Sequence, residues 1–224
     1  MHEPPRDEAE LIARLRRLGG MTLGAIAGAN GVSVPPDLGR NKGWVGQLLE
    51  RALGATGGSR AEPDFPALGI ELKTIPIDAG GRPLESCFVA SLDLAAVDRR
   101  WEQSPVRKKL ARVAWVAVEG SAEIPLPARR VGAALLWSPT VDDERVLRAD
   151  YEDIVELLDE GFAVSAHRGS VLQLRPKGRN AKDLRWALDE EGAPTRTAPR
   201  AFYLRRTFTA ALLAQNFARR AASP

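Results

Sequence analysis

Residues 63–75 read PDFPALGIELKTI, a short apolar segment that contains two acids and one lysine. Its second half, GIELKTI, has the length and apolar content of a β-strand. Because successive side chains of a strand point to opposite faces, Glu71 and Lys73 share one face, roughly 7 Å apart along the chain. Asp64 stands at the start of the segment, where the chain can bring its carboxylate beside them. The short, largely apolar run is typical of a central strand rather than an edge strand.

Asp64 and Glu71 could bind a metal ion together, because two converging carboxylates repel each other unless a cation lies between them. Oxygen-only ligation favours Mg²⁺, which keeps several waters and takes one or two carboxylates plus phosphate oxygens. Lys73 could hold an attacking water or help to deprotonate it, so the pattern suits metal-assisted hydrolysis of a phosphodiester. The same spacing also occurs on ordinary solvated strands with ion pairs, and spacing alone leaves both interpretations open.

The segments before this strand read as helices and loops. Residues 54–63 (GATGGSRAEP) indicate a mobile, glycine-rich loop of the kind that often borders active sites. Residues 43–53 (GWVGQLLERAL) form a helix with one broad apolar face, and Glu50 lies off that face. Apolar residues at helical spacing predict further helices over 6–18 and 22–31.

The rest of the chain is a mixture of strands and helices. Strands are predicted at 86–92, 112–119, 131–138 and 201–206, with a hairpin-like pair at 162–167 and 171–176. Helices are predicted at 141–160, at 181–190 with Asn180 as its cap, and from Thr207 or Thr209 onward. The pattern predicts a mixed α and β fold with a central sheet flanked by helices.

Length and composition bound the class of protein. A chain of 224 residues suits one large domain or one domain with two lobes. The single cysteine, Cys87, excludes an internal disulfide and fits a reducing cytosol. No run of about 18 apolar residues and no apolar signal core is present, so we expect a soluble, cytoplasmic protein without membrane contact. Having only two histidines argues against a histidine-based metal or nucleophile site.

Charge is nearly balanced, with 32 Lys and Arg against 29 Asp and Glu, but it is unevenly distributed. Residues 141–160 are strongly acidic, whereas 99–112, 168–185 and 200–220 are basic. That asymmetry suits a protein with one face for a polyanion, and it equally suits solvated helix faces.

Six segments carry a resemblance to a known family: KGWVGQLLERALGA, DFPALGIELKTIPID with GRPLE after it, SPVRKKLARVAWVAVEG, PLPARRVGAALLWSP, LQLRPKGRNAK and PRAFYLRRTFTAALLA. In this order, and over about residues 10–218, the chain resembles the MutH family of methyl-directed mismatch-repair endonucleases. The resemblance implies a restriction-endonuclease-like fold of the α/β (α+β) class, with a central mixed sheet and two lobes that form a DNA-binding cleft. It implies one endonuclease domain over 1–224, with a catalytic segment at about 42–75 and DNA-reading segments at about 168–206.

The family's catalytic motif falls on four residues of this chain. By resemblance, Asp64 and Glu71 bind the divalent metal and Lys73 positions or activates the nucleophilic water. Glu50 completes the metal site, a role that helical periodicity does not reveal. The implied cofactor is Mg²⁺; Mn²⁺ or Ca²⁺ can occupy the same site, and the number of ions stays open.

The resemblance also assigns DNA-binding residues. Arg175, Pro176 and Lys177 match the base-reading loop, and an arginine can bond bidentately to guanine O6 and N7. Tyr203 matches the tyrosine that senses adenine methylation, and Lys109 matches a lysine that contacts DNA near the scissile site. Without the resemblance, Tyr203 reads as a core residue and Lys109 as a solvated helix lysine.

Two neighbouring residues are assigned to packing. Phe88 matches a family phenylalanine near the cleft, but a phenylalanine in a strand is usually a core residue. Cys87 adjoins the same strand and is expected to be buried. The tail 219–224 has no evident role, and 93–100 departs from the family pattern.

The implied function is nicking of the unmethylated strand at hemimethylated or unmethylated GATC sites, 5′ to the guanine. The implied partners are double-stranded DNA, the MutL mismatch-repair ATPase and, indirectly, MutS, with the enzyme itself a monomer. One alternative is a stand-alone GATC restriction endonuclease, but that relative is longer and carries a second, similar domain. The other alternative is a non-catalytic GATC-binding module, against which the intact Asp64, Glu71 and Lys73 argue.

Overall fold

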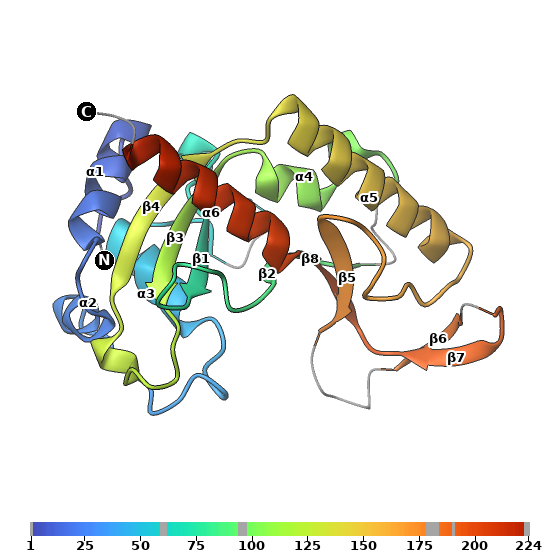
Figure 1. The fold of residues 1–224 in the computed structure, drawn as a ribbon, viewed down its shortest axis with the longest axis horizontal. Coiled ribbons are helices and arrows are strands. Elements are labelled where there is room, and N and C mark those ends of the chain that lie inside the picture. The colour runs from blue at the N-terminus through green and yellow to red at the C-terminus, as the bar shows by residue number, and fades with distance from the viewer. Residues whose placement is uncertain (1, 59–61, 94–97, 178–183, 190, 222–224) are drawn as a thin grey trace. The chain divides into compact units, whose positions relative to one another are not determined.

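The computed structural model divides into two compact units, each built from separate segments of the chain (Figure 1). Unit 1 comprises Met1–Glu85, Ala111–Ser138 and Leu213–Pro224, and unit 2 comprises Ser86–Leu110 and Pro139–Leu212. The structure describes residues 2–58, 62–93, 98–177, 184–189 and 191–221.

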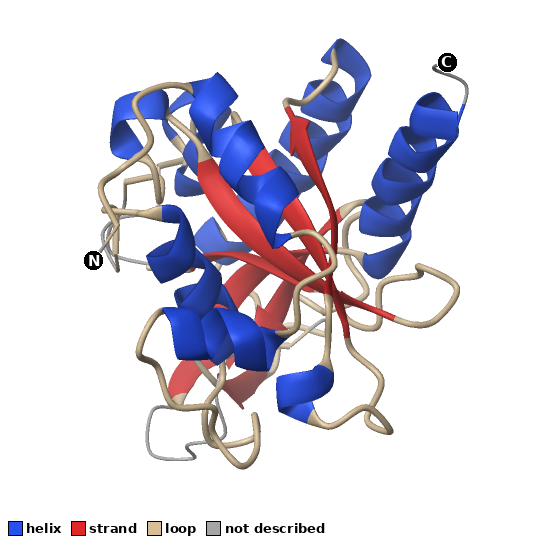
Figure 2. Ribbon diagram, turned by 90° about the vertical axis from the view of Figure 1, so that its left-hand side faces the viewer, coloured by secondary structure: helices blue, strands red, loops and turns tan. Residues whose placement is uncertain are grey.

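Unit 1 is a mixed three-stranded sheet covered by helices on one face. Strand β1 (Glu71–Ile77) runs parallel to β3 (Val113–Glu119), which runs antiparallel to β4 (Val131–Trp137). The helices of that face are α1 (Glu8–Leu18), α2 (Leu23–Ala29) and α3 (Trp44–Leu53), with short 3₁₀ turns η1 (Pro66–Leu68) and η3 (Leu126–Ala128). The part of α6 (Arg206–Ala221) from Leu213 onward also belongs to this unit. Figure 2 shows helices of this unit in front of its strands. Their shared core includes Leu11, Leu15, Leu23, Ile26, Leu48, Leu49, Leu53, Leu72, Ala114, Val116 and Val118.

The predicted helix starts of unit 1 are confirmed by their caps. The Asp7 side chain accepts a hydrogen bond from the backbone N–H of Glu10, and Thr22 accepts one from Ala25. Both bonds satisfy donors that would otherwise lack a partner in the first turn. These local signals are readable in sequence, which is why the bounds agree with the expected ones.

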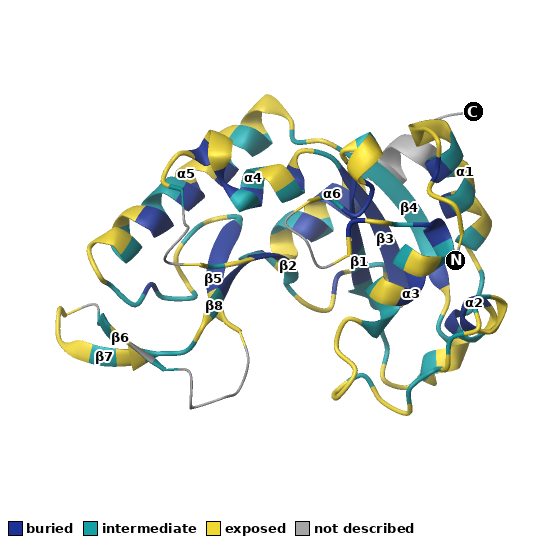
Figure 3. Ribbon diagram, turned by 180° about the vertical axis from the view of Figure 1, so that it is seen from behind, coloured by how far each residue is buried: buried dark blue, intermediate teal, exposed yellow. Residues whose placement is uncertain are grey.

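The position of β1 in its sheet differs from the prediction. The strand order is β1-β3-β4, so β1 lies at one end of this sheet and the expectation of a central strand was wrong. Its residues are nevertheless mostly buried, as the dark ribbon in Figure 3 shows. A short apolar run indicates only that a strand is buried. Here β1 is mostly buried although a neighbouring strand, β3, lies on one side of it only.

Unit 2 contains a second sheet in which β8 (Arg200–Leu204) lies between β2 (Cys87–Ser91) and β5 (Leu172–Pro176), antiparallel to both. Helix α5 (Val141–Asp159), gold in Figure 1, packs against β5, and α4 (Pro105–Leu110) packs against β2. The 3₁₀ turn η2 (Trp101–Gln103) contributes to the core.

Aromatic rings fill the core between this sheet and α5. The Tyr151 ring centroid lies 5.6 Å from that of Trp101 and 5.4 Å from that of Phe202. Burial raises the pKa of Tyr151 to about 12, and its hydroxyl donates a 2.7 Å hydrogen bond to the carbonyl oxygen of Asp98. One face of the sheet is therefore apolar and closed.

Two predictions in unit 2 were wrong. Part of the predicted helix 181–190 is instead strand β6 (Arg185–Leu188), paired with β7 (Pro194–Thr197). Gly192, at φ +81°, permits the chain reversal between them; Asn180, 181–183 and residue 190 lie outside the described residues. The predicted hairpin of 162–167 with 171–176 does not form either.

The partners of these two segments explain the second failure. Strand β5, which covers most of 171–176, pairs with β8, and the N–H of Ala163 donates to Leu188. The last helix, α6 (Arg206–Ala221), begins one residue before the expected Thr207. Within the described residues, no helix combines the length and apolar composition needed to cross a bilayer.

Candidate active site and nucleic-acid interface

Glu71 and Lys73 lie at the start of β1, on the face opposite α1, α2 and α3. Leu72, between them, belongs to the core shared with α1, α2 and α3. The Lys73 Nζ lies 3.3 Å from the Glu71 Oε1, and the two residues are only 6 % and 7 % exposed. A solvated strand would expose both side chains. The structure thus favours an interior ion pair, whose charges compensate each other at a buried position.

A tight turn brings the Asp64 carboxylate to the backbone of β1. Phe65 and Ile70 exchange backbone hydrogen bonds around the 3₁₀ turn η1, which folds the chain back on itself. As a result the Asp64 Oδ2 accepts a 2.8 Å hydrogen bond from the backbone N–H of Leu72, and Asp64 is 6 % exposed. The carboxylate therefore lies next to the start of β1, as the sequence predicts.

The glycine-rich loop before Asp64 is held against it. The backbone N–H groups of Thr56 and Gly57 donate to the Asp64 carbonyl oxygen at 2.9 and 3.0 Å. A Cβ at Gly57 would lie 2.2 Å from the Pro63 carbonyl oxygen, so only glycine fits this close approach. The loop thereby fixes the backbone on which the carboxylate stands.

Trp115 forms part of the surroundings of Lys73. In the parallel register of β1 and β3, Trp115 lies opposite Lys73 and is fully buried. Its ring centroid is 6.1 Å from that of Trp137 on β4. Large apolar rings on the same face of the sheet help to keep the ion pair away from water, which strengthens its electrostatic interactions.

The donor set fits a hard divalent cation with few protein ligands. Within the described parts of the chain, no three acidic, histidine or cysteine side chains are arranged as a metal-binding group. Asp64 and Glu71 nevertheless supply two carboxylates near the start of β1, and Mg²⁺ commonly takes only one or two. Glu50 is half-buried on α3, which packs against β1. Its place as a further ligand stays a prediction.

In unit 2, the face of the sheet turned away from α5 carries a basic–aromatic cluster, defined as Phe88, Arg175, Lys177 and Tyr203. Tyr203 lies opposite Phe88 on one side and Gln173 on the other. Its ring meets that of Phe88 edge-on, with centroids 5.6 Å apart, and the Arg175 guanidinium lies 5.9 Å from its centroid. Tyr203 is half-buried, while the adjacent Phe202 and Leu204 fill the core. The interpretation of Tyr203 as a core residue was therefore wrong.

The two cations of the cluster are held by serines of the β2 region. The Arg175 Nη1 donates to Ser86 Oγ at 3.0 Å, and the Lys177 Nζ donates to Ser91 Oγ at 2.5 Å. The Lys177 Nζ also lies 4.9 Å from the centroid of the Phe88 ring, within cation–π range. Pro176 and both cations are exposed. The structure thus brings together the residues expected to read DNA.

Phe88 is exposed, so its assignment to the core was wrong. It is 40 % exposed, whereas Val89 and Ala90 are both buried. The register with β8 shifts between Phe88 and Ala90, which marks a β-bulge. A bulge breaks the alternation of faces that a sequence pattern assumes. Cys87, expected to be buried, is half-exposed at the start of the same strand.

Lys109 lies on α4, the short helix that packs against β2. Val106 and Leu110 of this helix are buried and Lys109 is half-buried. The structure places it in the same unit as the basic–aromatic cluster, and its contact with DNA stays a prediction.

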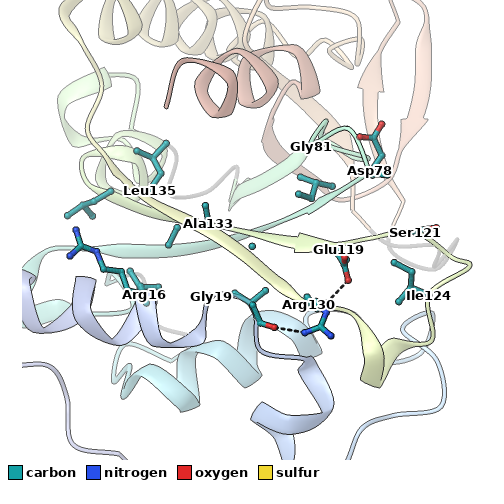
Figure 4. Close-up of a pocket in the computed structure, with 18 of the residues that line it drawn as sticks. Arg16, Gly19, Asp78, Gly81, Glu119, Ser121, Ile124, Arg130, Ala133 and Leu135 are labelled. Carbon is teal, nitrogen blue, oxygen red and sulfur yellow. Dashed lines mark hydrogen bonds between the residues drawn. The ribbon is translucent and has the colours of Figure 1, made fainter. Parts of the chain in front are cut away.

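A cavity of about 850 Å³ in unit 1 lies elsewhere (Figure 4). It is bordered by α1, β4 and the end of β1 at Ile77, and its lining contains none of the site residues predicted above. Arg130 crosses it, donating from its backbone to the Glu119 carboxylate and from its side chain to the Gly20 carbonyl oxygen. The cavity is therefore not the site formed by Glu71 and Lys73 at the start of β1.

Comparison with known proteins identifies the family. Residues 53–150, which include Asp64, Glu71 and Lys73, match the family model described as DNA mismatch repair enzyme MutH. The chain is 51 % identical over 217 residues to the DNA mismatch repair protein MutH of Serratia proteamaculans, covering 96 % of this chain and 95 % of the relative. It is 52 % identical over 220 residues to that of Klebsiella pneumoniae (strain 342), covering 97 % and 95 %. The chain belongs to the MutH family.

Membership of the MutH family confirms the fold class. MutH proteins have the restriction-endonuclease-like fold, and the mixed sheet of unit 1 with its flanking helices agrees with it. The near full-length match also extends over Glu50, Arg175 and Tyr203, which no local pattern singles out.

Proposed function

We propose that this MutH protein is a divalent-metal-dependent endonuclease that nicks the unmethylated strand at hemimethylated or unmethylated GATC sites, 5′ to the guanine. The observation that carries the proposal is the buried group at the start of β1, where the Asp64 carboxylate accepts the N–H of Leu72, the residue between the paired Glu71 and Lys73. Membership of a DNA mismatch repair family supports it.

In the proposed mechanism, Asp64 and Glu71 would hold Mg²⁺, and Glu50 would complete the site; Mn²⁺ or Ca²⁺ could take its place. When bound, the ion supplies positive charge that stabilises the reacting phosphate and the leaving 3′ oxygen. The Lys73 ammonium, held by Glu71, donates a hydrogen bond to the attacking water and orients it in line with the scissile bond. The products are a 5′-phosphate and a 3′-hydroxyl.

The basic–aromatic cluster is proposed to read the DNA. Arg175 bonds to guanine in the major groove, while Pro176 and Lys177 complete the base-reading loop. The Tyr203 ring lies against adenine N6, where an added methyl group would collide with it. Lys109 contacts a phosphate near the scissile site. Non-specific phosphate contacts supply most of the salt-dependent affinity.

The proposed cellular context is mismatch repair in which the MutL ATPase, signalled by MutS, activates a monomeric enzyme. The expectation that two lobes enclose DNA concerns the arrangement of the two units and stays a prediction.

A nicking assay tests the proposal. Purified protein would be given Mg²⁺ and plasmids whose GATC sites are unmethylated, hemimethylated or fully methylated, with and without MutL. We expect single-strand nicks at the first two substrates, stimulation by MutL and little cleavage of the third. Rapid cutting of both strands without MutL would identify a stand-alone restriction enzyme, and binding without cleavage would identify a GATC-binding module.

Tyr203→Ala is expected to narrow the difference in nicking rate between hemimethylated and fully methylated sites, because the ring that excludes the methyl group is removed. Tyr203→Phe keeps the ring and should keep the difference. The measurement is the ratio of initial nicking rates on the two plasmids. A ratio that Tyr203→Ala leaves unchanged would assign methyl sensing to another residue.

Arg175→Ala is expected to weaken binding to a GATC duplex by about 1–3 kcal/mol, with little change on unrelated DNA. The lost contact is a bidentate hydrogen bond to one base. Titration of labelled duplexes at fixed salt measures both affinities. Arg148→Ala is a matched control, because Arg148 is an exposed arginine of α5 engaged with Glu102 and Glu152. Equal losses on both duplexes would make Arg175 a phosphate contact.

A further inference from the structure

Asp150 is a buried acid that the proposed mechanism does not use. It lies on α5, is 7 % exposed, and its carboxylate accepts four hydrogen bonds from the segment 170–172. Oδ1 accepts from the backbone N–H and the hydroxyl of Ser170, at 2.8 and 3.0 Å. Oδ2 accepts from the backbone N–H groups of Val171 and Leu172, at 2.7 and 2.8 Å. One side chain thus fixes three consecutive residues that lead into β5.

Arg205 holds the other half of the same loop. It follows β8 directly, and its backbone N–H donates to the Val171 carbonyl oxygen at 2.8 Å. Its guanidinium donates to the carbonyl oxygens of four consecutive residues, at 3.4, 2.7, 3.0 and 2.9 Å for Ala166, His167, Arg168 and Gly169. The planar fork of an arginine suits such convergent acceptors.

The loop itself leaves no room for adjustment at Gly169. That residue has φ +80°, and a Cβ there would lie 1.9 Å from the Leu172 carbonyl oxygen and 3.3 Å from the Asp150 carboxyl carbon. The chain therefore enters β5 along one tightly defined path between α5 and the end of β8.

The path of the chain into β5 determines which side chains of this strand lie on the face of the basic–aromatic cluster. Arg175 is opposite Ala201 and shares the face of Tyr203, whereas Leu174 is buried on the other face. Because strand side chains alternate, a slip of one residue would turn Arg175 into the core and Leu174 outward. Arg175 is three residues from the position that Asp150 anchors.

We infer that Asp150 and Arg205 form a register clamp, which fixes β5 against β8 and thereby determines how strongly the protein discriminates GATC from related sequences. The inference deepens the proposed function and rests on it. Asp150 and Arg205 act through Arg175 and Lys177 and are positioning residues. They hold the two reading cations at fixed places relative to Tyr203.

Asp150→Asn tests the clamp with a near-isosteric change. An amide retains one acceptor oxygen, so either the N–H and hydroxyl of Ser170 or the N–H groups of Val171 and Leu172 must face an NH₂ group instead. Asp153→Asn is the matched control: Asp153 lies on the same helix and contacts the same loop through Arg168, but its side chain is 38 % exposed. The hydrogen bonds from Arg168 lower the pKa of the Asp153 carboxyl, so the control also removes a negative charge at neutral pH.

The measured quantity is the ratio of kcat/KM on GATC to that on sites with one substituted base pair. We expect Asp150→Asn to lower this ratio by about tenfold, and Asp153→Asn to leave it within about twofold of wild type. A purely structural role reduces the folded fraction equally for every substrate and would leave the ratio unchanged. An unchanged ratio in Asp150→Asn, with activity lower on all sites, would overturn the inference.

Two further measurements keep the test decisive. If Asp150→Asn does not fold, Arg205→Lys retains the charge but not the fork, and its ratio should fall in the same direction; an unchanged ratio there counts against the clamp. Hydrogen exchange of the backbone amides of 170–175 should accelerate in either clamp variant and not in Asp153→Asn.

If the wild-type protein shows no GATC preference, the proposed function and the specificity role fail together. Hydrogen exchange would still confirm or reject the clamp itself.

Discussion

Asp64→Ala is expected to abolish nicking while DNA binding persists. The carboxylate is proposed to hold the metal ion, whose charge stabilisation is worth several kcal/mol, and each roughly 1.4 kcal/mol changes a rate tenfold. We therefore expect the single-turnover nicking rate to fall by about 10³-fold or more. Binding to a GATC duplex, measured at the same salt concentration, should remain near that of wild type.

A second substitution separates charge from structure at this position. The Asp64 Oδ2 also accepts the N–H of Leu72, so alanine removes a structural hydrogen bond as well as a charge. Asp64→Asn keeps an acceptor for Leu72 and removes only the charge. Equal inactivity of both variants would support metal binding. Nicking by either variant at nearly the wild-type rate would contradict the assignment of Asp64 to the metal.

Lys73→Met should reduce both activity and stability. Loss of the group that orients the attacking water is expected to lower the nicking rate by about 10²–10⁴-fold. The Glu71 carboxylate, 6 % exposed, would also lose its cationic neighbour. Breaking a buried ion pair in this way costs about 3–5 kcal/mol, which denaturant unfolding in the absence of divalent metal would measure.

The double variant Glu71→Gln with Lys73→Met distinguishes the two effects. In the double variant position 71 no longer carries a buried charge without its partner, and Asp64 keeps the hydrogen bond from Leu72, so the free energy of unfolding should recover most of the loss. Activity should not recover, because neither the proposed metal ligand nor the water-orienting group is present. Recovery of nicking in the double variant would show that the pair serves stability alone.

The strand that carries Glu71 and Lys73 could be predicted from sequence because its signals are local. Alternation places Glu71 and Lys73 on one face, and a short turn returns Asp64 to the start of the strand. Sequence could not decide whether that face is solvated, because its neighbours in the sheet, such as Trp115 opposite Lys73, come from a strand far along the chain. The same limit explains the wrong position of β1 in its sheet.

The face that carries the basic–aromatic cluster was harder to predict for a different reason. The β-bulge between Phe88 and Ala90 turns a phenylalanine outward, against the alternation on which the core assignment depends. Strand β5 joins β8, about thirty residues later, and not its sequence neighbour at 162–167, because side chains of α5 and Arg205 satisfy the intervening loop. Glu50 carries no local signal at all, and only resemblance to the MutH family assigns it a role.

The parallel pairing of β1 with β3 has a consequence for how this protein is made. Glu71 lies beside Val113, and the connection between the two strands runs through Ser86–Leu110, which belongs to unit 2. Neither unit is a continuous segment, so neither can be completed from the first half of a nascent chain. Contacts of long sequence separation slow folding, because a large loop must close before they form. During synthesis Asp64 and Glu71 therefore leave the ribosome before β3, and unit 1 is completed only when its last segment, which begins at Leu213, has been made.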